Sequence, residues 1–362
     1  MSGPNNALAV VEKLTGLAKD LTDVLQDPLF DSLAYTQHEQ LLIKLRAADF
    51  SAATTVFMGA HLEHARPVSS GRRYVPLAAD FLDAPPTEIP LGSVFLLLNN
   101  DIGKSLTRYI DFYRAHPQAL FIVWDWDSQH WVQMSTLLAM NCDVYVPASS
   151  ENAFLLSHFN PCVLGPVYVG AHQWTRRFLM DHFDLLMAPR ATTPFGPHVH
   201  YEKFPKRNRA VASLARHFES VRFTDNRFKA RTDEENLREW AGYQSHWIVP
   251  VLGGVPIRVF NALVTGGIPI VPAFYRNLPE VAVLGTSPLY YGVHDLIEPA
   301  AIHAAANRRF MSQDDGGLVQ RITEALATQH VDSRCEQIFG LLRTTVESLL
   351  SGSAAPMAIT EP

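Results

Sequence analysis

Short apolar runs, each bounded by Gly, Pro, Asn or Asp, recur along the chain from Thr54 onward. The runs are TTVFMGA (54–60), SVFLLLN (93–99), ALFIVWD (119–125), DVYVPA (143–148) and CVLGPV (162–167). Continuous runs of this kind, without polar alternation, are typical of strands buried on both faces of a parallel sheet. Helix-like segments at 104–115 and 131–140 separate several of them. The pattern therefore predicts a doubly wound α/β unit.

A second series of strand-like runs begins at Phe183. Its predicted strands are 183–189, 220–225, 246–252, 268–273 and 288–293, with helices at 209–218, 233–243 and 258–265 between them. Thr232 and Glu235 have the spacing of a capping box at the start of the second of these helices. Further helices are predicted at 317–328 and 334–350, so this part of the chain repeats the α/β pattern of the first.

Together the two series predict an α/β fold of two Rossmann-like domains in tandem, preceded by helices. The predicted boundaries are 1–50 for the N-terminal helical segment, 51–178 for the first domain, 179–335 for the second, 336–350 for a closing helix and 351–362 for a disordered tail. Ligands of open α/β sheets bind beyond the carboxyl ends of the strands, so a ligand cleft is expected between the two domains.

Composition and charge narrow the class of protein. Of the 362 residues, 47% are hydrophobic and 18% are charged, which excludes an intrinsically disordered chain. The formal net charge of −6 argues against a nucleic-acid partner for the chain as a whole. The three cysteines lack metal-ligand spacing and fit a reduced, cytoplasmic location. We find no signal peptide and no apolar stretch of about 18 residues, so no transmembrane segment is expected. A peripheral membrane contact through the N-terminal helices stays open.

The stretch PVLGGVPIRVFNALVTGGIPIVP (250–272) carries the most informative pattern. A predicted strand ends at Gly253 and Gly254, and Pro256 leads into a helix that carries Arg258 and Asn261. Backbone amides at such a turn, together with the dipole of the helix, favour a bound anion. The guanidinium of Arg258 would add a forked donor for phosphate. The alternative is an ordinary αβ unit whose glycines serve packing only.

The order of residues in this stretch resembles the C-terminal-domain signature of GT-B glycosyltransferases. That signature has a glycine-rich or acidic turn, a short run with Pro or Arg, a helix close to Glu-Ala-Leu-Ala-x-Gly and a strand that reads Pro-Ile-Val. The matching positions here are Gly253, Gly254, Pro256, Arg258, Phe260, Asn261, Ala262, Leu263, Gly266, Pro269, Ile270 and Val271. The match looks closest to bacterial members with an R-x-F-E-A-L core, including those similar to spore-maturation glycosyltransferases.

The resemblance implies transfer of a sugar from a nucleotide-sugar donor to a hydroxyl group of a saccharide or glycolipid acceptor, in bacterial polysaccharide or glycoconjugate assembly. It implies no cofactor and no bound metal. In the family, two glutamates eight residues apart contact the donor sugar and the nucleotide ribose, whereas this chain has Gly253 and Asn261 there. Because of this departure, a non-catalytic protein derived from a glycosyltransferase, which binds a ligand or a partner, stays open as the alternative.

Further residues are expected around the donor. The basic residues Arg207 and Arg209 fall at the start of a predicted helix, where they would hold a diphosphate or simply face solvent. Tyr243 and Ser245 lie just before the strand that leads to the signature, and we expect them to line the nucleotide pocket. With Gly253, Gly254, Pro256, Arg258 and Asn261, they make up the predicted donor site.

The candidate catalytic residues lie in IVWDWDSQHW (122–131). Asp125 and Asp127 end an apolar strand, and in an extended segment residues i and i+2 point to the same side. Both carboxylates and the nearby His130 are therefore predicted to face the acceptor side of the cleft, where one of them would be the general base. The alternatives are helix capping, or a metal-binding Asp-x-Asp motif like that of GT-A glycosyltransferases.

Polar residues also follow two other predicted strands. His61 and His64 come after the first run, and Asn99, Asn100 and Asp101 come after the second. They are expected to face the same cleft. A histidine there would suit a catalytic base, although a lone histidine in a loop more often has a structural role.

Overall fold

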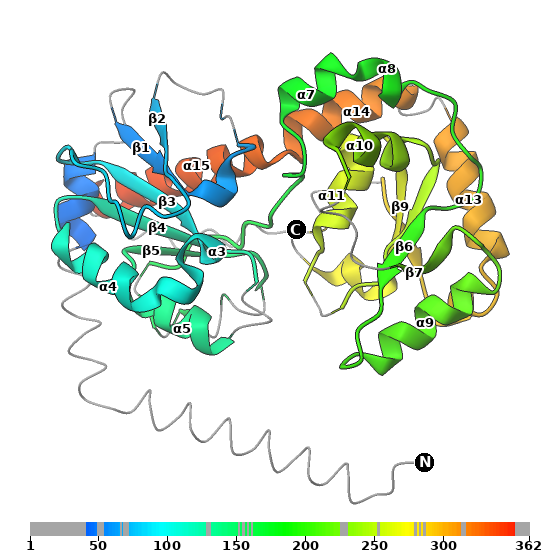
Figure 1. Ribbon diagram of the computed structural model, residues 1–362, viewed down its shortest axis with the longest axis horizontal. Coiled ribbons are helices and arrows are strands. Elements are labelled where there is room, and N and C mark those ends of the chain that lie inside the picture. The colour runs from blue at the N-terminus through cyan, green and yellow to red at the C-terminus, as the bar shows by residue number, and fades with distance from the viewer. Residues whose placement is uncertain are drawn as a thin grey trace, which may run out of the picture.

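The chain folds into two lobes, each built on parallel strands with helices on both sides (Figure 1). This α/β class with parallel sheets agrees with the one expected from the sequence. The computed structural model describes residues 41–48, 54–65, 67, 72–127, 132–150, 153, 156–157, 159–160, 162–224, 231–251, 254–278, 281, 284, 287–312 and 316–351. All but the first residue of the expected tail at 351–362, and most of the expected N-terminal helical segment, lie outside these residues. Residue 351 belongs to a helix, and residues 41–48 are helical.

The N-terminal lobe is a five-stranded parallel sheet in the order β2-β1-β3-β4-β5. Its strands are β1 (Thr55–Met58), β2 (Arg73–Pro76), β3 (Val94–Leu98), β4 (Leu120–Asp125) and β5 (Val144–Pro147). Every residue of β3, β4 and β5 is buried, as the continuous apolar runs predicted. Short helices follow two strands: η1 (Ala60–Leu62) follows β1, and α3 (Asn99–Ile102) with η2 (Gly103–Ser105) follows β3.

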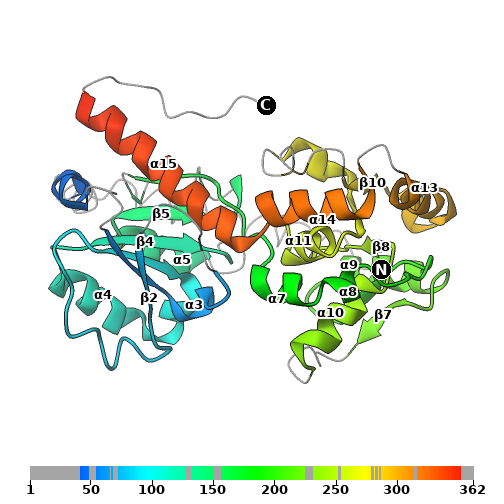
Figure 2. The ribbon, with the colours of Figure 1, turned by 90° about the horizontal axis from the view of Figure 1, so that it is seen from above.

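The two faces of this sheet hold separate cores because alternate side chains of a strand point to opposite faces. Phe95 and Phe121 pack under α4 (Leu106–Ala115) and α5 (Val132–Met140), with 4.7 Å between their stacked rings. Leu96 and Trp124 pack on the other face, against the last helix, α15 (Val331–Ser351). The helix α15 thus returns from the far end of the chain to cover the first sheet, as Figure 2 shows.

The C-terminal lobe repeats the strand order of the first. Its strands are β6 (Gly196–Val199), β7 (Val221–Thr224), β8 (Ser245–Trp247), β9 (Ile268–Pro272) and β10 (Leu289–Tyr291). A parallel bridge between Phe195 and His246 joins the β6-β7 pair to β8-β9-β10, so the order across the lobe is β7-β6-β8-β9-β10. In each lobe the second strand lies outside the first, and the remaining strands follow on the other side.

Helices surround this second sheet. They are α7 (Arg176–Asp181), α8 (Phe183–Leu186), α9 (Pro205–Ala215), α10 (Asp233–Ala241), α11 (Ile257–Val264), η4 (Ala273–Asn277), η5 (His294–Leu296), α13 (Ala300–Met311) and α14 (Gly317–Thr328). The predicted capping box of α10 is confirmed: Glu235 N–H donates to Thr232 Oγ1 at 3.2 Å, and Thr232 N–H donates to Glu235 Oε2 at 2.8 Å.

Two predicted strands are not strands. Residues 183–189 begin with α8 because the apolar side chains of this region recur at helical spacing from Leu179 to Leu186, a period that the shorter window concealed. Residues 162–167 run beside β5 but make a single ladder bridge, between Val163 and Tyr145. Gly165 and Pro166 end the run, since glycine weakens a strand and proline cannot donate to a ladder.

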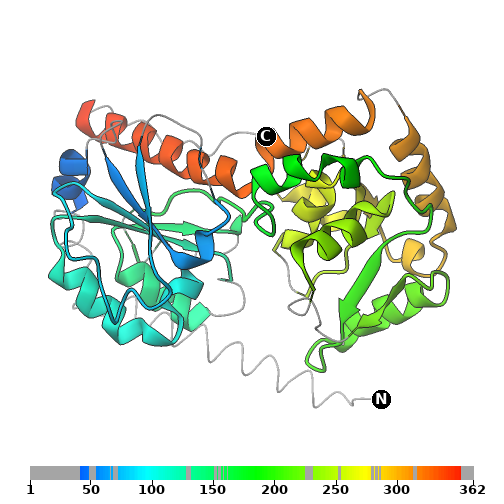
Figure 3. The same cartoon turned by 45° about the horizontal axis from the view of Figure 1, so that its top comes forward.

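The chain crosses between the lobes twice, and the two crossings lie side by side (Figure 3). We call residues 168–175 the crossing segment; residues 329–331 lead back. Ala171 N–H donates to Gln329 O and Val331 N–H donates to Ala171 O, both at 2.8 Å. The guanidinium of Arg334 lies 3.8 Å from the ring of Tyr168, which stacks on Phe260 of α11 at 4.7 Å. The crossings are thereby tied to the helix that carries the most informative sequence pattern.

Candidate functional site

A cleft of about 1360 Å³ opens between the carboxyl ends of the two sheets. In an open α/β sheet, ligands bind where the direction of strand order reverses, which is between β1 and β3 in one lobe and between β6 and β8 in the other. Residues next to both reversal points line the cleft: His61 and Asn100 from the N-terminal lobe, Pro197 and Val251 from the C-terminal lobe. The two preferred ligand positions therefore face one cavity.

His61 and Asp101 form a hydrogen-bonded pair on the N-terminal wall. Asp101 Oδ1 lies 2.8 Å from His61 Nδ1 and accepts the His61 backbone N–H at 2.8 Å, and Oδ2 accepts Leu98 N–H at 2.7 Å. The Asp101 carboxylate is fully buried, whereas 53% of the His61 side chain is exposed. A carboxylate on Nδ1 fixes the ring and leaves Nε2 as the basic nitrogen, which is the arrangement of a general base.

Gly59 makes room for this pair. A Cβ atom at position 59 would lie 1.7 Å from Asp101 Oδ2, so only glycine lets the carboxylate reach under the end of β1. The sequence pointed to this region only through polar residues after two neighbouring apolar runs. The sequence leaves His61 open between a catalytic base and a structural histidine, because it does not reveal that a buried carboxylate forty positions later meets its ring.

The predicted acidic pair is divided by the fold. Asp125 is 1% exposed, accepts hydrogen bonds from Tyr145 Oη and from Asp127 N–H, and lies beneath the cleft surface. Burial raises its pKa, and the hydrogen bond from Tyr145 offsets part of this effect. Asp127 lines the cleft, and Asn99 Nδ2 donates to its Oδ2 at 3.3 Å. Asp127 is thus the carboxylate of the pair that can reach a ligand, while Asp125 shapes the turn.

Arg258 and the N-terminus of α11 form the opposite wall. Gly254, Pro256, Ile257 and Arg258 all line the cleft, so α11 begins at this wall. Arg258 Nη1 donates to Pro197 O, and its guanidinium lies 5.6 Å from the ring of Trp240. Its Nε and Nη2 are buried without a hydrogen-bond partner among the described residues. Burial lowers the pKa of Arg258 to about 10, with a smaller effect of Arg207, so the group stays charged at neutral pH.

A neutral histidine separates Arg258 from the second predicted arginine. His198 Nδ1 lies 3.3 Å from Arg207 Nη2 and 3.5 Å from Arg258 Nη1. Burial, and then the two guanidiniums, hold the pKa of His198 well below its usual range, so its ring is an acceptor for both. Arg207 also donates to Val199 O and to Val249 O. Its nitrogens thus fasten β6 to the end of β8, and it does not line the cleft.

The other predicted donor residues lie in several places. Gly254, Pro256, Arg258 and Asn261 are brought together at the start and along one face of α11. Arg209 is exposed on α9, Ser245 is fully buried in β8, and Tyr243 packs 5.0 Å from Phe195. None of these three lines the cleft. Gly253 and the predicted catalytic His130 lie outside the described residues.

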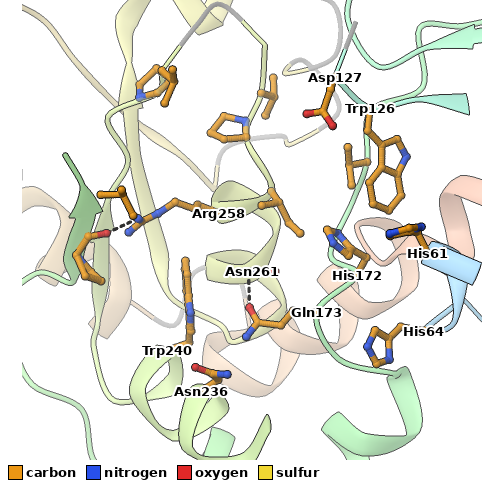
Figure 4. A pocket seen from close by; sticks show the side chains of 18 of the residues that line it. His61, His64, Trp126, Asp127, His172, Gln173, Asn236, Trp240, Arg258 and Asn261 are labelled. Atoms are coloured by element: carbon orange, nitrogen blue, oxygen red, sulfur yellow. Dashed lines mark hydrogen bonds between the residues drawn. The ribbon is translucent and has the colours of Figure 1, made fainter. Parts of the chain in front are cut away.

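Figure 4 shows the centre of the cleft, where Gln173 of the crossing segment meets α11. Asn261 Nδ2 donates to Gln173 Oε1 at 2.9 Å. His172 lies next to Gln173 in the crossing segment and packs against Trp126, with 4.5 Å between the ring centres. Burial lowers the pKa of His172 to about 3, with smaller effects of His64 and His330, so the ring is neutral. Sequence reasoning missed Gln173 and His172, since no motif marks the crossing segment.

Among the described residues, no group of three or more His, Cys, Asp or Glu side chains is placed to hold a metal ion. Across the same part of the chain, every helix is too short or too polar to cross a membrane. Comparison with protein-family models and with curated proteins gave no match.

Proposed function

We propose that the protein is a glycosyltransferase of the GT-B type that moves a sugar from a nucleotide-sugar to a hydroxyl acceptor. In this proposal the two lobes are the two Rossmann-like domains. One observation carries it: the His61–Asp101 pair lies on one wall of the cleft, and the N-terminus of α11 and Arg258, whose Nε and Nη2 are unpaired, lie on the other. A base and an anion site that face each other across one cleft are what transfer from a phosphate leaving group requires.

The acceptor side of the reaction belongs to the N-terminal wall. The acceptor hydroxyl oxygen attacks the anomeric carbon while His61 Nε2 takes its proton, and the bond from that carbon to the leaving phosphate oxygen breaks. The proton ends on His61, where the buried Asp101 carboxylate stabilises the imidazolium. Asp127 and Trp126, which also line this wall, suit the hydroxyl groups and the ring face of a saccharide acceptor.

The leaving group belongs to the C-terminal wall. Negative charge develops on the phosphate oxygen as its bond to the sugar breaks, and fixed donors aimed at that position lower the barrier. The unpaired Nε and Nη2 of Arg258 are such donors, and the dipole at the N-terminus of α11 would add to the stabilisation of the charge. A saccharide or glycolipid acceptor and a cytoplasmic location are part of the proposal, as the resemblance implies.

Binding and turnover test the proposal together. A thermal-shift screen with UDP, GDP, CMP and dTDP selects the nucleotide that raises the midpoint, and sugar release is then measured with its nucleotide-sugars. His61→Gln should lower kcat by about 10²- to 10⁴-fold with little change in nucleotide affinity. Arg258→Met should weaken nucleotide binding by about 10- to 100-fold, because a charged hydrogen-bond donor is lost. His294→Gln, an exposed histidine of the C-terminal lobe, is the control.

The outcomes separate the proposal from its alternative. Tight nucleotide binding without any sugar release would favour the non-catalytic binding protein, which the absence of the two glutamates at Gly253 and Asn261 keeps in view. No binding of any nucleotide, or unchanged turnover in His61→Gln, would overturn the assignment.

A further inference from the structure

The middle of the cleft is lined by the crossing segment, and its polar groups are incompletely paired. Gln173 is 8% exposed and Asn261 is 3% exposed, and both line the cavity. Each uses one end of its amide in their mutual hydrogen bond of 2.9 Å. Gln173 Nε2 and Asn261 Oδ1 are then left buried, with no hydrogen-bond partner in the described part of the chain. A buried amide end without a hydrogen-bond partner is unfavourable, so a cleft-facing pair of this kind is suited to a ligand.

The position of Gln173 indicates which part of a ligand it meets. If the base lies on one wall and the phosphate site on the other, the reacting sugar lies between them. The crossing segment supplies the lining at that midpoint, through Val169, His172 and Gln173. Asn261, the partner of Gln173, is three residues after Arg258 and therefore lies on the same face of α11, one turn from the phosphate site. A ring bonded to the phosphate would reach this pair.

The chemistry of the midpoint is that of a neutral polyol site. The amides of Gln173 and Asn261 offer a donor and an acceptor without charge, and the neighbouring ring of His172 is held neutral by burial. Sugar hydroxyls both donate and accept, so they can satisfy both orphaned amide ends. A carboxylate at this point would meet no cation on the crossing segment, whose lining residues carry none.

We propose that Gln173 recognises a ring hydroxyl of the transferred sugar, that this sugar is neutral, and that Asn261 is the positioning residue that holds the Gln173 amide. The inference rests on the proposed function and adds to it the residue that selects the sugar. In this proposal Gln173 has a different role from the phosphate-binding groups at the start of α11. It belongs to the crossing segment and to neither sheet.

Calorimetry with paired ligands tests it. The nucleotide chosen in the thermal-shift screen is titrated alone and as its neutral hexose conjugate, for example UDP and UDP-glucose or GDP and GDP-mannose. Gln173→Met should weaken binding of the conjugate by about three- to tenfold and leave the Kd of the bare nucleotide unchanged. A second series uses donors that each lack one ring hydroxyl. For the wild type, removal of one particular hydroxyl should weaken binding by a similar factor. For Gln173→Met, removal of the same hydroxyl should weaken binding no further.

Controls keep the result interpretable. Gln320→Met, on the exposed side of α14, is the matched control. If Gln173→Met does not fold, Gln173→Ser replaces it, because serine leaves room for water beside Asn261. An equal loss for nucleotide and conjugate would assign Gln173 to the nucleoside and overturn the proposal, as would no loss in either. Tighter binding of the uronic acid conjugate than of the neutral one would overturn the neutral sugar. No binding of any nucleotide would overturn the proposed function as a whole, whereas normal turnover with an indifferent Gln173 would overturn this inference alone.

Discussion

His246 is a buried base without a hydrogen-bond partner among the described residues. It is 0% exposed, its ring stacks on Trp240 at 5.1 Å, and neither ring nitrogen is paired. Burial, with smaller effects of Arg190 and Arg258, holds its pKa well below the usual 6.5. The folded protein therefore keeps this ring neutral at pH values where the ring is protonated in the unfolded chain. As a result, the free energy of unfolding decreases as the pH falls.

We predict that His246 contributes to acid destabilisation. Because the unfolded state binds the extra proton, the contribution is absent above about pH 6.5 and grows as the pH falls toward the folded pKa, at up to about 1.4 kcal/mol per pH unit. Between pH 6.5 and 5, the free energy of unfolding of His246→Gln should therefore decrease less steeply with falling pH than that of the wild type, by up to the same amount per pH unit. Urea unfolding at several pH values measures it, with His294→Gln as an exposed control. An unchanged slope in His246→Gln would show that the ring is protonated in the folded state.

The candidate site shows which single-residue inferences a sequence permits. Asp125 and Asp127 have the i, i+2 spacing that puts two side chains on one side of a strand, yet β4 ends at Asp125 and the chain turns there. The pattern cannot locate that turn within two residues, and one carboxylate ends in the core while the other reaches the cleft. The His61–Asp101 pair depends on two strands being neighbours in a sheet, which no local pattern encodes.

At the scale of elements, α11 shows why the limits of some helices can be predicted from the sequence. Its limits follow from Pro256 at one end and from Gly266 at the other, where φ is +75°. A left-handed residue that ends a helix favours glycine, and this one also lies against α14: a Cβ atom would be 2.4 Å from Leu318 Cδ1 and 2.8 Å from Ile322 Cγ1. Elements with such terminal signals are predictable, whereas the short helix α8 lacks a side-chain cap and lies where the sequence predicts a strand.

Two glycine substitutions should have opposite effects. Gly266→Ala should lower the free energy of unfolding by about 2 kcal/mol or more, because the backbone angle is costly for alanine and the methyl group meets α14. Gly340→Ala, inside α15 with nothing within 4 Å of the new Cβ, should raise it by about 0.5–1 kcal/mol. Denaturant unfolding of both variants measures this. A neutral Gly266→Ala would mean that α14 does not pack on the end of α11 in solution.

At the scale of the whole molecule, the order of elements along the chain differs from their grouping in space. The sequence predicted tandem α/β units with a separate closing helix at 336–350, but α15 packs on the N-terminal sheet, through Cys335, Ile338, Phe339, Leu342 and Val346. A long-range return of this kind leaves only an amphipathic period in the sequence, which fits either lobe equally well. The return also doubles the connection between the lobes, and a bridge between Ala171 and His330 joins the two crossings.

Truncation of Phe339 tests which of the two lobes α15 stabilises. It is 1% exposed, packs in the core beneath β3 and β4, and lies 4.8 Å from the guanidinium of Arg72. Phe339→Ala should lower the free energy of unfolding by about 3–5 kcal/mol, through lost burial and the cavity left behind. Thr344→Ala, on the exposed face of the same helix, should change it by less than about 0.5 kcal/mol. Hydrogen exchange should then locate the loss: in Phe339→Ala the amides of β3 and β4 exchange faster, while those of β8 and β9 keep their protection. Faster exchange in β8 and β9, with β3 and β4 unaffected, would place α15 in the other lobe. That result would contradict the packing of α15 on the N-terminal sheet, whose strand ends support one wall of the cleft.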